Sequence, residues 1–435
     1  MSIAGTAARP EALLSRRRLV IFGRGLLWAV ILTAGTKPSE VLGPGEQAIG
    51  VSASGDVEIR ALILMACMAA SAIAILTDKV RRSGFLFVPF LCWAFTVAVI
   101  QQSEFASAKQ LGSYASWILF YVAATALLDE PGDYKKLATA LVASVVISAL
   151  GGELQHLLGY GPQLGSRWPE GLNLEFMRTH TGGGGILLDA FTPYCAAVLL
   201  LSLPGSWKRQ ALAWLLVLWG TANILRGGLL ALAVALVWLI CRASRVSRRQ
   251  MLVSLSVAAL AGGLLFGGTI ADKISDPDEG VNTSGRLDVW PMLTDWIMEE
   301  PLIGHGPDAD MSMLAASAGG RDIVASHNEL LSTGVNFGLI GVALLWTPLL
   351  LLLFYSVSQS LRASPERQAT LAGATAFLIM VTILSLTDNT LRTPGVMILA
   401  LSPVAVTTGL RKRTFASAVL PKMYFTPQRT RREAF

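Results

Sequence analysis

Apolar runs recur along nearly the whole chain, and polar residues gather in the stretches between them. A helix needs about 20 apolar residues to cross a bilayer core of roughly 30 Å. Helical runs, rather than alternating strands of about ten residues, argue against a barrel. The pattern predicts an all-α polytopic membrane protein with about 12 transmembrane helices, near 19–36, 61–77, 85–101, 111–128, 137–158, 186–204, 210–225, 227–241, 251–270, 330–355, 369–387 and 395–410.

Composition supports this fold class. Of the 435 residues, 53% are hydrophobic and only 15% are charged, whereas a soluble domain carries about 25% charged residues. The four cysteines lie in or at the edges of the apolar runs, with no CxxC pair and no metal-ligand spacing. We therefore predict neither a metal site nor a cofactor.

Lysine and arginine are unevenly distributed between alternate connections, and this predicts the orientation. With the N-terminus inside, 24 of the 35 basic residues fall on the cytoplasmic side, including a basic tail at 411–435. Both termini are therefore expected in the cytoplasm. The net charge of +6 reflects this bias, so it does not indicate nucleic-acid binding.

No linker or internal repeat divides the chain, so residues 1–435 are expected to form one integral-membrane domain. The largest polar stretch, 271–329, is predicted to be an outer loop with short helices. Within it, "RLDVWPMLTDWIMEEP" spaces its apolar residues at helical intervals, which predicts a short amphipathic helix on the membrane surface or capping the bundle.

The segment "SHNELLSTGVNFGLIG" places a histidine at the start of an outer-facing helix. Ser326 and Glu329 form an S-x-x-E capping box, which predicts that His327 is the first helical residue. Counted from His327, glycines at positions +7, +11 and +14 share its face and would admit a neighbouring helix or a lipid tail. These helix-packing glycines are Gly334, Gly338 and Gly341.

Two arginines are the predicted partners of His327. Arg226 lies at the tip of a hairpin of apolar helices too short to clear the hydrocarbon, and a charge at that depth is a functional candidate. Arg286 stands at the start of the amphipathic helix, in a stretch otherwise rich in acids. Snorkelling and a salt bridge to Asp288, respectively, are the alternatives.

Weaker candidates surround this trio. Asn328 and Glu329 directly follow the histidine and could support it. Arg178 precedes a glycine run that could cradle phosphate but is more often a hinge. Arg392, in the short turn "DNTLRTPG", is expected to be solvated, with a smaller chance of touching substrate.

The motif "HN", nine residues and "GLIG", with "SGRLDVW…EEPLIGHG" and "ILRGGLLAL" upstream, is similar to the signature of the O-antigen ligase and polymerase superfamily of bacterial membrane glycosyltransferases. The clear overlap runs from about 210 to 350, within a ligase- or polymerase-like core at 186–355. Leu225 stands where that family has Ser. The family's Phe-x-Pro-Asn stretch before the sixth span is absent.

This resemblance implies a function and roles for three residues. His327 matches the catalytic histidine, and Arg226 and Arg286 match the arginines that bind the donor diphosphate. The expected reaction is a metal-independent, inverting transfer at the periplasmic face of the bacterial inner membrane. The expected partners are a polyprenyl-diphosphate-linked oligosaccharide donor, a glycan acceptor (a lipid-linked repeat or lipid A core) and membrane lipids.

Three acceptors remain open: lipid A core for a ligase, a lipid-linked repeat for a polymerase, and a protein for a third variant. We favour the polymerase slightly. A secondary transporter or flippase of an anionic lipid or saccharide is the alternative from another class. Transporters place charges at mid-membrane and show paired broken helices, whereas the charged candidates here cluster at one face.

Overall fold

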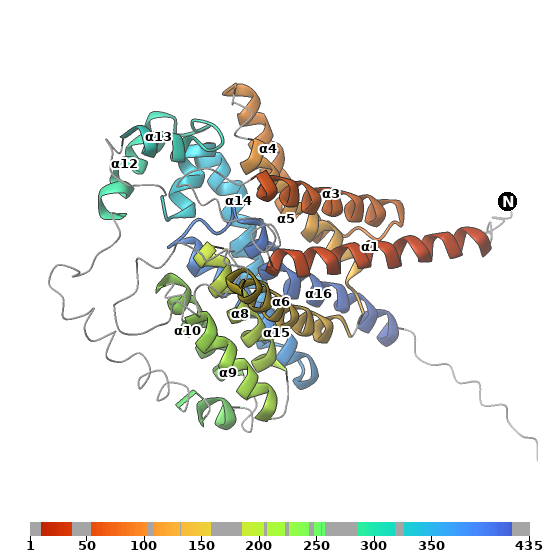
Figure 1. Ribbon diagram of the computed structural model, residues 1–435. Coiled ribbons are helices and arrows are strands. Elements are labelled where there is room, and N and C mark those ends of the chain that lie inside the picture. The colour runs from red at the N-terminus through yellow and green to blue at the C-terminus, as the bar shows by residue number, and fades with distance from the viewer. Residues whose placement is uncertain are drawn as a thin grey trace, which may run out of the picture.

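A computed structural model describes residues 10–36, 54–102, 108–130, 132–157, 185–203, 207–221, 226–242, 248–253, 255–256, 286–317 and 326–419. These residues form a bundle of helices joined by turns, with no strand within the ranges described (Figure 1). The predicted all-α class is therefore confirmed for this part of the chain.

The helices follow the apolar runs, because each run satisfies its own backbone hydrogen bonds only as a helix. Helical residues overlap every expected span, and of 251–270 only the first residues, which are helical, are described. Their bounds are α1 (Pro10–Thr36), α3 (Ser54–Leu76), the 3₁₀ helix η1 (Arg82–Phe87), α4 (Val88–Ile100), α5 (Ala108–Leu127), α6 (Asp133–Leu157), α8 (Gly185–Ser202), α9 (Trp207–Thr221), α10 (Arg226–Arg242), α12 (Arg286–Glu299), α13 (Ala309–Ser317), α14 (Glu329–Leu361), α15 (Pro365–Ser385) and α16 (Pro394–Val419).

Among the described residues, three helical stretches are long and apolar enough to cross a membrane: Arg82–Ile100, Glu329–Leu361 and Arg367–Ser385. Four shorter apolar helical stretches, of 10–17 residues, accompany them. The total of 12 spans and the orientation of the chain remain predictions.

Helix α5 lies at the centre of the bundle and is buried along nearly its whole length. It packs against α3, α4 and α16 (Figure 1). Its Tyr114 stacks edge-to-face on Phe90 of α4 and Phe337 of α14, with ring centroids 5.0 and 5.9 Å apart. Aromatic pairs in this geometry stabilise a fold by more than the apolar area that they bury. The cluster therefore fixes α14 against the centre of the bundle.

A buried arginine fastens α1 to the turn between α5 and α6. Arg24 donates to the Leu127 carbonyl at 2.8 Å and to an Asp133 carboxylate oxygen at 2.6 Å. It also lies 3.0 Å from Glu130. A charge inside an apolar run is costly unless it is paired, and this acidic turn supplies the pairing.

Helix α14 is broken at Gly338, where φ is 65° and ψ is −176°. The break leaves carbonyls without their helical partners, and neighbouring segments satisfy them. His305 donates its backbone N–H to the Val335 carbonyl at 2.8 Å, and the Trp93 indole donates to the Phe337 carbonyl at 2.9 Å. The residues before the break therefore form a separate short helix, held by the turn that follows α12.

Helices α12 and α13 cap the end of the bundle at which α14 begins (Figure 1). The predicted amphipathic helix is confirmed as α12. Its Leu293 and Ile297 pack with Leu314 of α13 and Val335 of α14 in a small apolar core of their own. These contacts are those expected of a helix that caps the bundle, and a position on the membrane surface stays a prediction.

Candidate active site

His327 lies in the short non-helical segment 326–328 just before α14, rather than inside the helix. Asn328 is the N-cap, and its side-chain oxygen accepts from the backbone N–H groups of Leu330 and Leu331 at 3.0 and 3.2 Å. The predicted Ser326–Glu329 capping box is therefore wrong. Asn is as good an N-cap as Ser, so the sequence placed the helix start two residues too early.

The backbone of His327 has a φ of 46°, in the left-handed region. Non-glycine residues rarely adopt this conformation, and where they do it is often at functional sites. The conformation sets the His327 side chain apart from the helix that follows. Its imidazole is 37% exposed, so a substrate hydroxyl could reach it.

The turn between α15 and α16 lies beside this histidine. Asp388 brings a carboxylate oxygen to 3.4 Å from Nδ1 of His327, and the same oxygen accepts the backbone N–H of Asn389 at 2.8 Å. The Ser326 hydroxyl donates to the Asn389 side-chain oxygen at 2.8 Å. These contacts join the segment before α14 to the turn before α16.

This geometry favours one tautomer of the imidazole. A carboxylate facing Nδ1 favours a proton on that nitrogen, which leaves the Nε2 lone pair available as a base. The contact at 3.4 Å is long for a hydrogen bond, although such contacts often tighten when substrate binds. The pair can therefore take a proton from a substrate hydroxyl.

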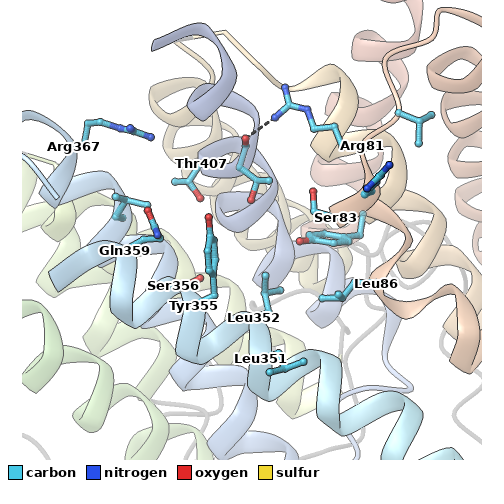
Figure 2. A pocket seen from close by; sticks show the side chains of 15 residues that line it. Arg81, Ser83, Leu86, Leu351, Leu352, Tyr355, Ser356, Gln359, Arg367 and Thr407 are labelled. Atoms are coloured by element: carbon cyan, nitrogen blue, oxygen red, sulfur yellow. Dashed lines mark hydrogen bonds between the residues drawn. The ribbon is translucent and has the colours of Figure 1, made fainter. Parts of the chain in front are cut away.

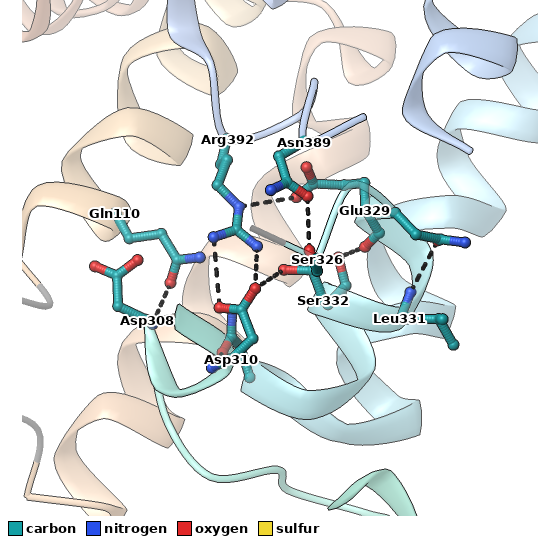
Figure 3. Close-up of polar contacts among 12 residues, drawn as sticks. Gln110, Asp308, Asp310, Ser326, Glu329, Leu331, Ser332, Asn389 and Arg392 are labelled. Carbon is teal, nitrogen blue, oxygen red and sulfur yellow. Dashed lines mark hydrogen bonds and ion pairs between the residues drawn. The ribbon is translucent and has the colours of Figure 1, made fainter. Parts of the chain in front are cut away.

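The Arg392 side chain lies next to this segment and is largely buried, with Asp310 facing its guanidinium (Figure 3). It donates to both Asp310 carboxylate oxygens, at 2.6 and 3.4 Å, and its Nε lies 3.9 Å from Glu329. The expectation that Arg392 is solvated is therefore wrong. Its carboxylate partners come from α13 and α14, which pack over the turn. Arg392 is therefore removed from solvent because it forms an ion pair inside the protein.

Asp310 is fully buried, and side chains of α14 donate further hydrogen bonds to its carboxylate. The Ser332 hydroxyl donates to it at 2.7 Å and the Asn336 side-chain amide at 2.9 Å. The backbone N–H of Asp310 donates in turn to the Asn336 side-chain oxygen at 2.9 Å. Buried charges are tolerated when they are both paired and hydrogen-bonded, and this carboxylate meets both conditions.

Glu329 opens α14 and points inward from the helix. It accepts the Tyr114 hydroxyl at 2.8 Å on one oxygen, while its second oxygen has no partner among the described residues. Its role as an N-cap partner of Ser326 is thus replaced by a buried role next to Arg392. Together with Asp310, it gives this cluster two carboxylates for one guanidinium (Figure 3).

The electrostatics follow from that arrangement. Burial alone would lower the pKa of Arg392, but the carboxylates of Asp310 and Glu329 outweigh it and raise the pKa above its usual range. Nearby Asp308 is partly buried, and loss of solvent raises its pKa to about 6. Within the described ranges, no three His, Cys, Asp or Glu residues gather to hold a metal ion.

The three glycines contact protein rather than an open groove. A Cβ on Gly334 would lie 2.6 Å from Ile297 of α12, and one on Gly338 would lie 2.2 Å from the Leu302 carbonyl oxygen. A Cβ on Gly341 would meet Phe337 at 2.3 Å. Because the helix breaks at Gly338, the three glycines do not form one continuous face beneath His327. Gly334 faces helix α12, as expected of a helix-packing glycine, and Gly338 faces the segment after α12.

The two predicted arginines are the first residues of helices that converge on His327. For both arginines the structure describes the backbone only. Arg226 starts α10, and a Cβ on the next residue, Gly227, would lie 2.2 Å from Thr387, the neighbour of Asp388. Arg286 starts α12, whose Trp290 indole donates to the carbonyl of Ser326 at 3.2 Å. The fold thus brings both helix starts to the end of the bundle that holds the histidine.

Arg178, the remaining candidate, lies outside the described residues. The sequence reasoning missed Asp388, Asp310 and Tyr114 as members of this site. Asp388 stands in the quoted turn "DNTLRTPG", four residues before Arg392, and the acidic start of that turn was its only local signal. Asp310 and Tyr114 carry no local signal at all.

These features describe a helical protein of membrane type with a histidine–carboxylate pair at one end of its bundle. The family model described as O-antigen ligase matches residues 211–346. That range includes His327, Arg226 and Arg286, and the match supports the resemblance to the O-antigen ligase and polymerase superfamily. No match to an individual curated protein was found.

Proposed function

We propose that this protein transfers a glycan from a polyprenyl-diphosphate donor to an acceptor sugar hydroxyl at the periplasmic face of the inner membrane. The observation that carries the proposal is the convergence of His327, Asp388 and the starts of α10 and α12 at one end of the bundle. The family match over the same segment supports it.

His327 acts as the general base in this proposal. Asp388 holds the ring, and Nε2 takes the proton of the acceptor hydroxyl as its oxygen attacks the anomeric carbon. Removing a single base of this kind typically costs 10²–10⁴ in rate. The half-exposed position of the ring suits an acceptor that arrives from outside the bundle.

Arg226 and Arg286 bind the donor diphosphate. The bond between the anomeric carbon and the diphosphate oxygen breaks, and the electron pair leaves with the diphosphate. Guanidinium groups stay charged and can bind two phosphate oxygens at once, which stabilises this leaving group without a metal. Direct displacement inverts the anomeric carbon.

Arg226→Lys tests whether the guanidinium group must bind two phosphate oxygens at once. We expect a large loss of transfer, because one ammonium group cannot bind two phosphate oxygens in the same way. Full turnover by the lysine variant would reduce Arg226 to a simple positive charge.

A reconstitution assay tests the reaction and distinguishes its acceptors. Purified protein in vesicles receives a lipid-linked repeat, with or without lipid A core. Chain growth without core supports the polymerase, which we favour slightly, and transfer only to core supports the ligase. Movement of the lipid-linked repeat across the bilayer without a new glycosidic bond would contradict the proposal and support a transporter.

Asp388→Asn sharpens the same assay. An asparagine keeps the size of the side chain but can present an amide N–H to the imidazole, so the preferred tautomer is lost. We expect transfer to fall about 10–100-fold, as for other groups that orient a histidine. Unchanged transfer would remove Asp388 from the mechanism.

A further inference from the structure

A second candidate site lies at the opposite end of α14. A cavity of about 970 Å³ opens between the start of η1, the C-terminal half of α14, the first turns of α15 and the end of α16. None of the residues that line it belongs to the cluster around His327. It is large enough for part of a lipid but is not a cleft for the reaction proposed above.

The lining of this cavity is divided by chemistry. Figure 2 shows Arg81 and Arg367 at one end and Leu86, Leu351 and Leu352 at the other. Arg82 also lines it. This division matches an amphiphile with an anionic head and an apolar tail. Leu351 is 57% exposed and continues the apolar surface away from the cavity.

Positive charge at the polar end is incompletely neutralised. Arg81 donates to the Thr408 carbonyl at 2.6 Å, and burial lowers its pKa, although Asp129 acts in the opposite direction. Among the described residues, no carboxylate pairs with Arg82 or Arg367. An anion between these guanidinium groups would therefore gain favourable contacts.

A buried hydroxyl provides an independent observation. The Tyr121 side chain on α5 lines the cavity and is fully buried, yet its hydroxyl has no hydrogen-bond partner among the described residues. Leaving such a group unpaired in the protein interior is unfavourable. A ligand with acceptor oxygens in the cavity would satisfy it.

The position of the cavity fits a membrane interface. The helical stretch Arg82–Ile100 is long enough to cross a membrane, and the cavity lies at its start. Just after its other end, the Gln101 side chain donates to the carbonyl of Gly304, in the turn that pairs with the short helix after His327. The cavity and the histidine therefore lie near opposite faces. In the orientation expected from the sequence, the cavity belongs to the cytoplasmic face.

We propose that this cavity binds an anionic phospholipid of the cytoplasmic leaflet, with the phosphate between Arg82 and Arg367 and the acyl chains along the leucines. Basic pockets between membrane helices on the cytoplasmic side are suited to anionic lipid head groups. The bound lipid bridges η1 to α14 and α15 across the cavity.

The test measures binding of phosphatidylglycerol to delipidated protein by native mass spectrometry, with phosphatidylcholine and inorganic phosphate as parallel probes. Each arginine near an anionic surface contributes roughly a fivefold affinity. We therefore expect the double variant R82Q/R367Q to bind phosphatidylglycerol about 25-fold more weakly. Arg362→Gln is the matched control, because Arg362 is an exposed arginine one turn from the cavity and does not line it.

Tyr121→Phe tests the buried hydroxyl separately. It should weaken phosphatidylglycerol binding several-fold without lowering the melting temperature of the lipid-free protein. The proposal is overturned if the double variant binds like the control, or if phosphatidylcholine binds equally well. Full competition by millimolar inorganic phosphate would also overturn it, since the site would then serve a soluble anion.

Discussion

Replacing Arg392 by methionine removes the guanidinium that, among the described residues, pairs with the buried carboxylates of Asp310 and Glu329. Methionine keeps much of the side-chain volume, so the change is mainly electrostatic. Both carboxylates are fully buried and would be left without their cation. We expect the folded protein to lose about 3–5 kcal/mol, the usual cost of breaking a buried pair from one side.

The contacts give the same range. A hydrogen bond to a charged group contributes about 1.5–3 kcal/mol. The 2.6 Å contact between Arg392 and Asp310 counts in full, the 3.4 Å contact counts in part, and the 3.9 Å approach to Glu329 adds an ion pair without a hydrogen bond. Neutralising the carboxylate in the same variant should then recover stability. In D310N/R392M the introduced asparagine could keep the bonds to Ser332 and Asn336, since an amide offers both a donor and an acceptor.

The assay is thermal unfolding in detergent, followed by tryptophan fluorescence, together with a denaturant titration. Extrapolating the size dependence of melting to this chain gives about 1–2 °C per kcal/mol, so R392M should melt roughly 3–10 °C below the unmodified protein. R362M is the control, because an exposed arginine should change stability by less than about 0.5 kcal/mol.

Two results would refute this reasoning. A loss below about 1 kcal/mol in R392M would mean that the cluster is solvated or that its carboxylates are neutral. A double variant D310N/R392M whose loss equals the sum of the single losses would mean that the two groups do not interact, since coupled neighbours deviate by about 0.5–3 kcal/mol.

Three further predictions concern the same end of the bundle. His327→Asn should abolish transfer while keeping the melting temperature, because asparagine accepts the positive φ of this position; residual transfer above about a tenth would argue against a general base. Gly338→Ala should destabilise the protein by about 3 kcal/mol or more, because a Cβ meets the Leu302 carbonyl at a φ of 65°. Gly25→Ala, where a Cβ meets nothing within 4 Å, is its control and should be neutral or slightly stabilising, and equal effects would contradict the close approach. Asp308→Asn should stabilise the protein above pH 6, by up to about 3 kcal/mol, because the pKa of Asp308 is raised to about 6 from its ordinary value of 3.8. The unmodified protein therefore loses stability as pH rises from about 4 to 6, because folding opposes ionisation of Asp308. The unmodified protein and the asparagine variant should melt alike below pH 4, and a pH-independent difference between them would exclude this linkage.

The sequence was most informative where local pattern decides local structure. Apolar runs long enough to be buried or to face lipid become helices, and the spacing around Leu293 and Ile297 predicted α12 and its apolar face. The same reasoning failed at Gly338. Glycine inside an apolar run is compatible with a straight helix, and the break here depends on Pro301 and His305, whose backbone groups pair across it.

The candidate site shows the same division. His327 was found because a histidine at the mouth of an apolar helix is conspicuous within a short segment. Arg392 was expected to be solvated because its own turn is polar, whereas its partners Asp310 and Glu329 lie 82 and 63 residues away along the chain. Such pairs are decided by packing that no window of sequence contains.

The turn between α15 and α16 has a consequence for the order in which the protein is made. A ribosome releases His327 about sixty residues before Asp388, so a nascent chain that ends within α15 carries the histidine without its carboxylate. At that stage Asp310 and Glu329 also lack Arg392. The contacts between His327 and Asp388 and between Asp310 and Arg392 can form only when the turn has been translated and α16 has followed it into place.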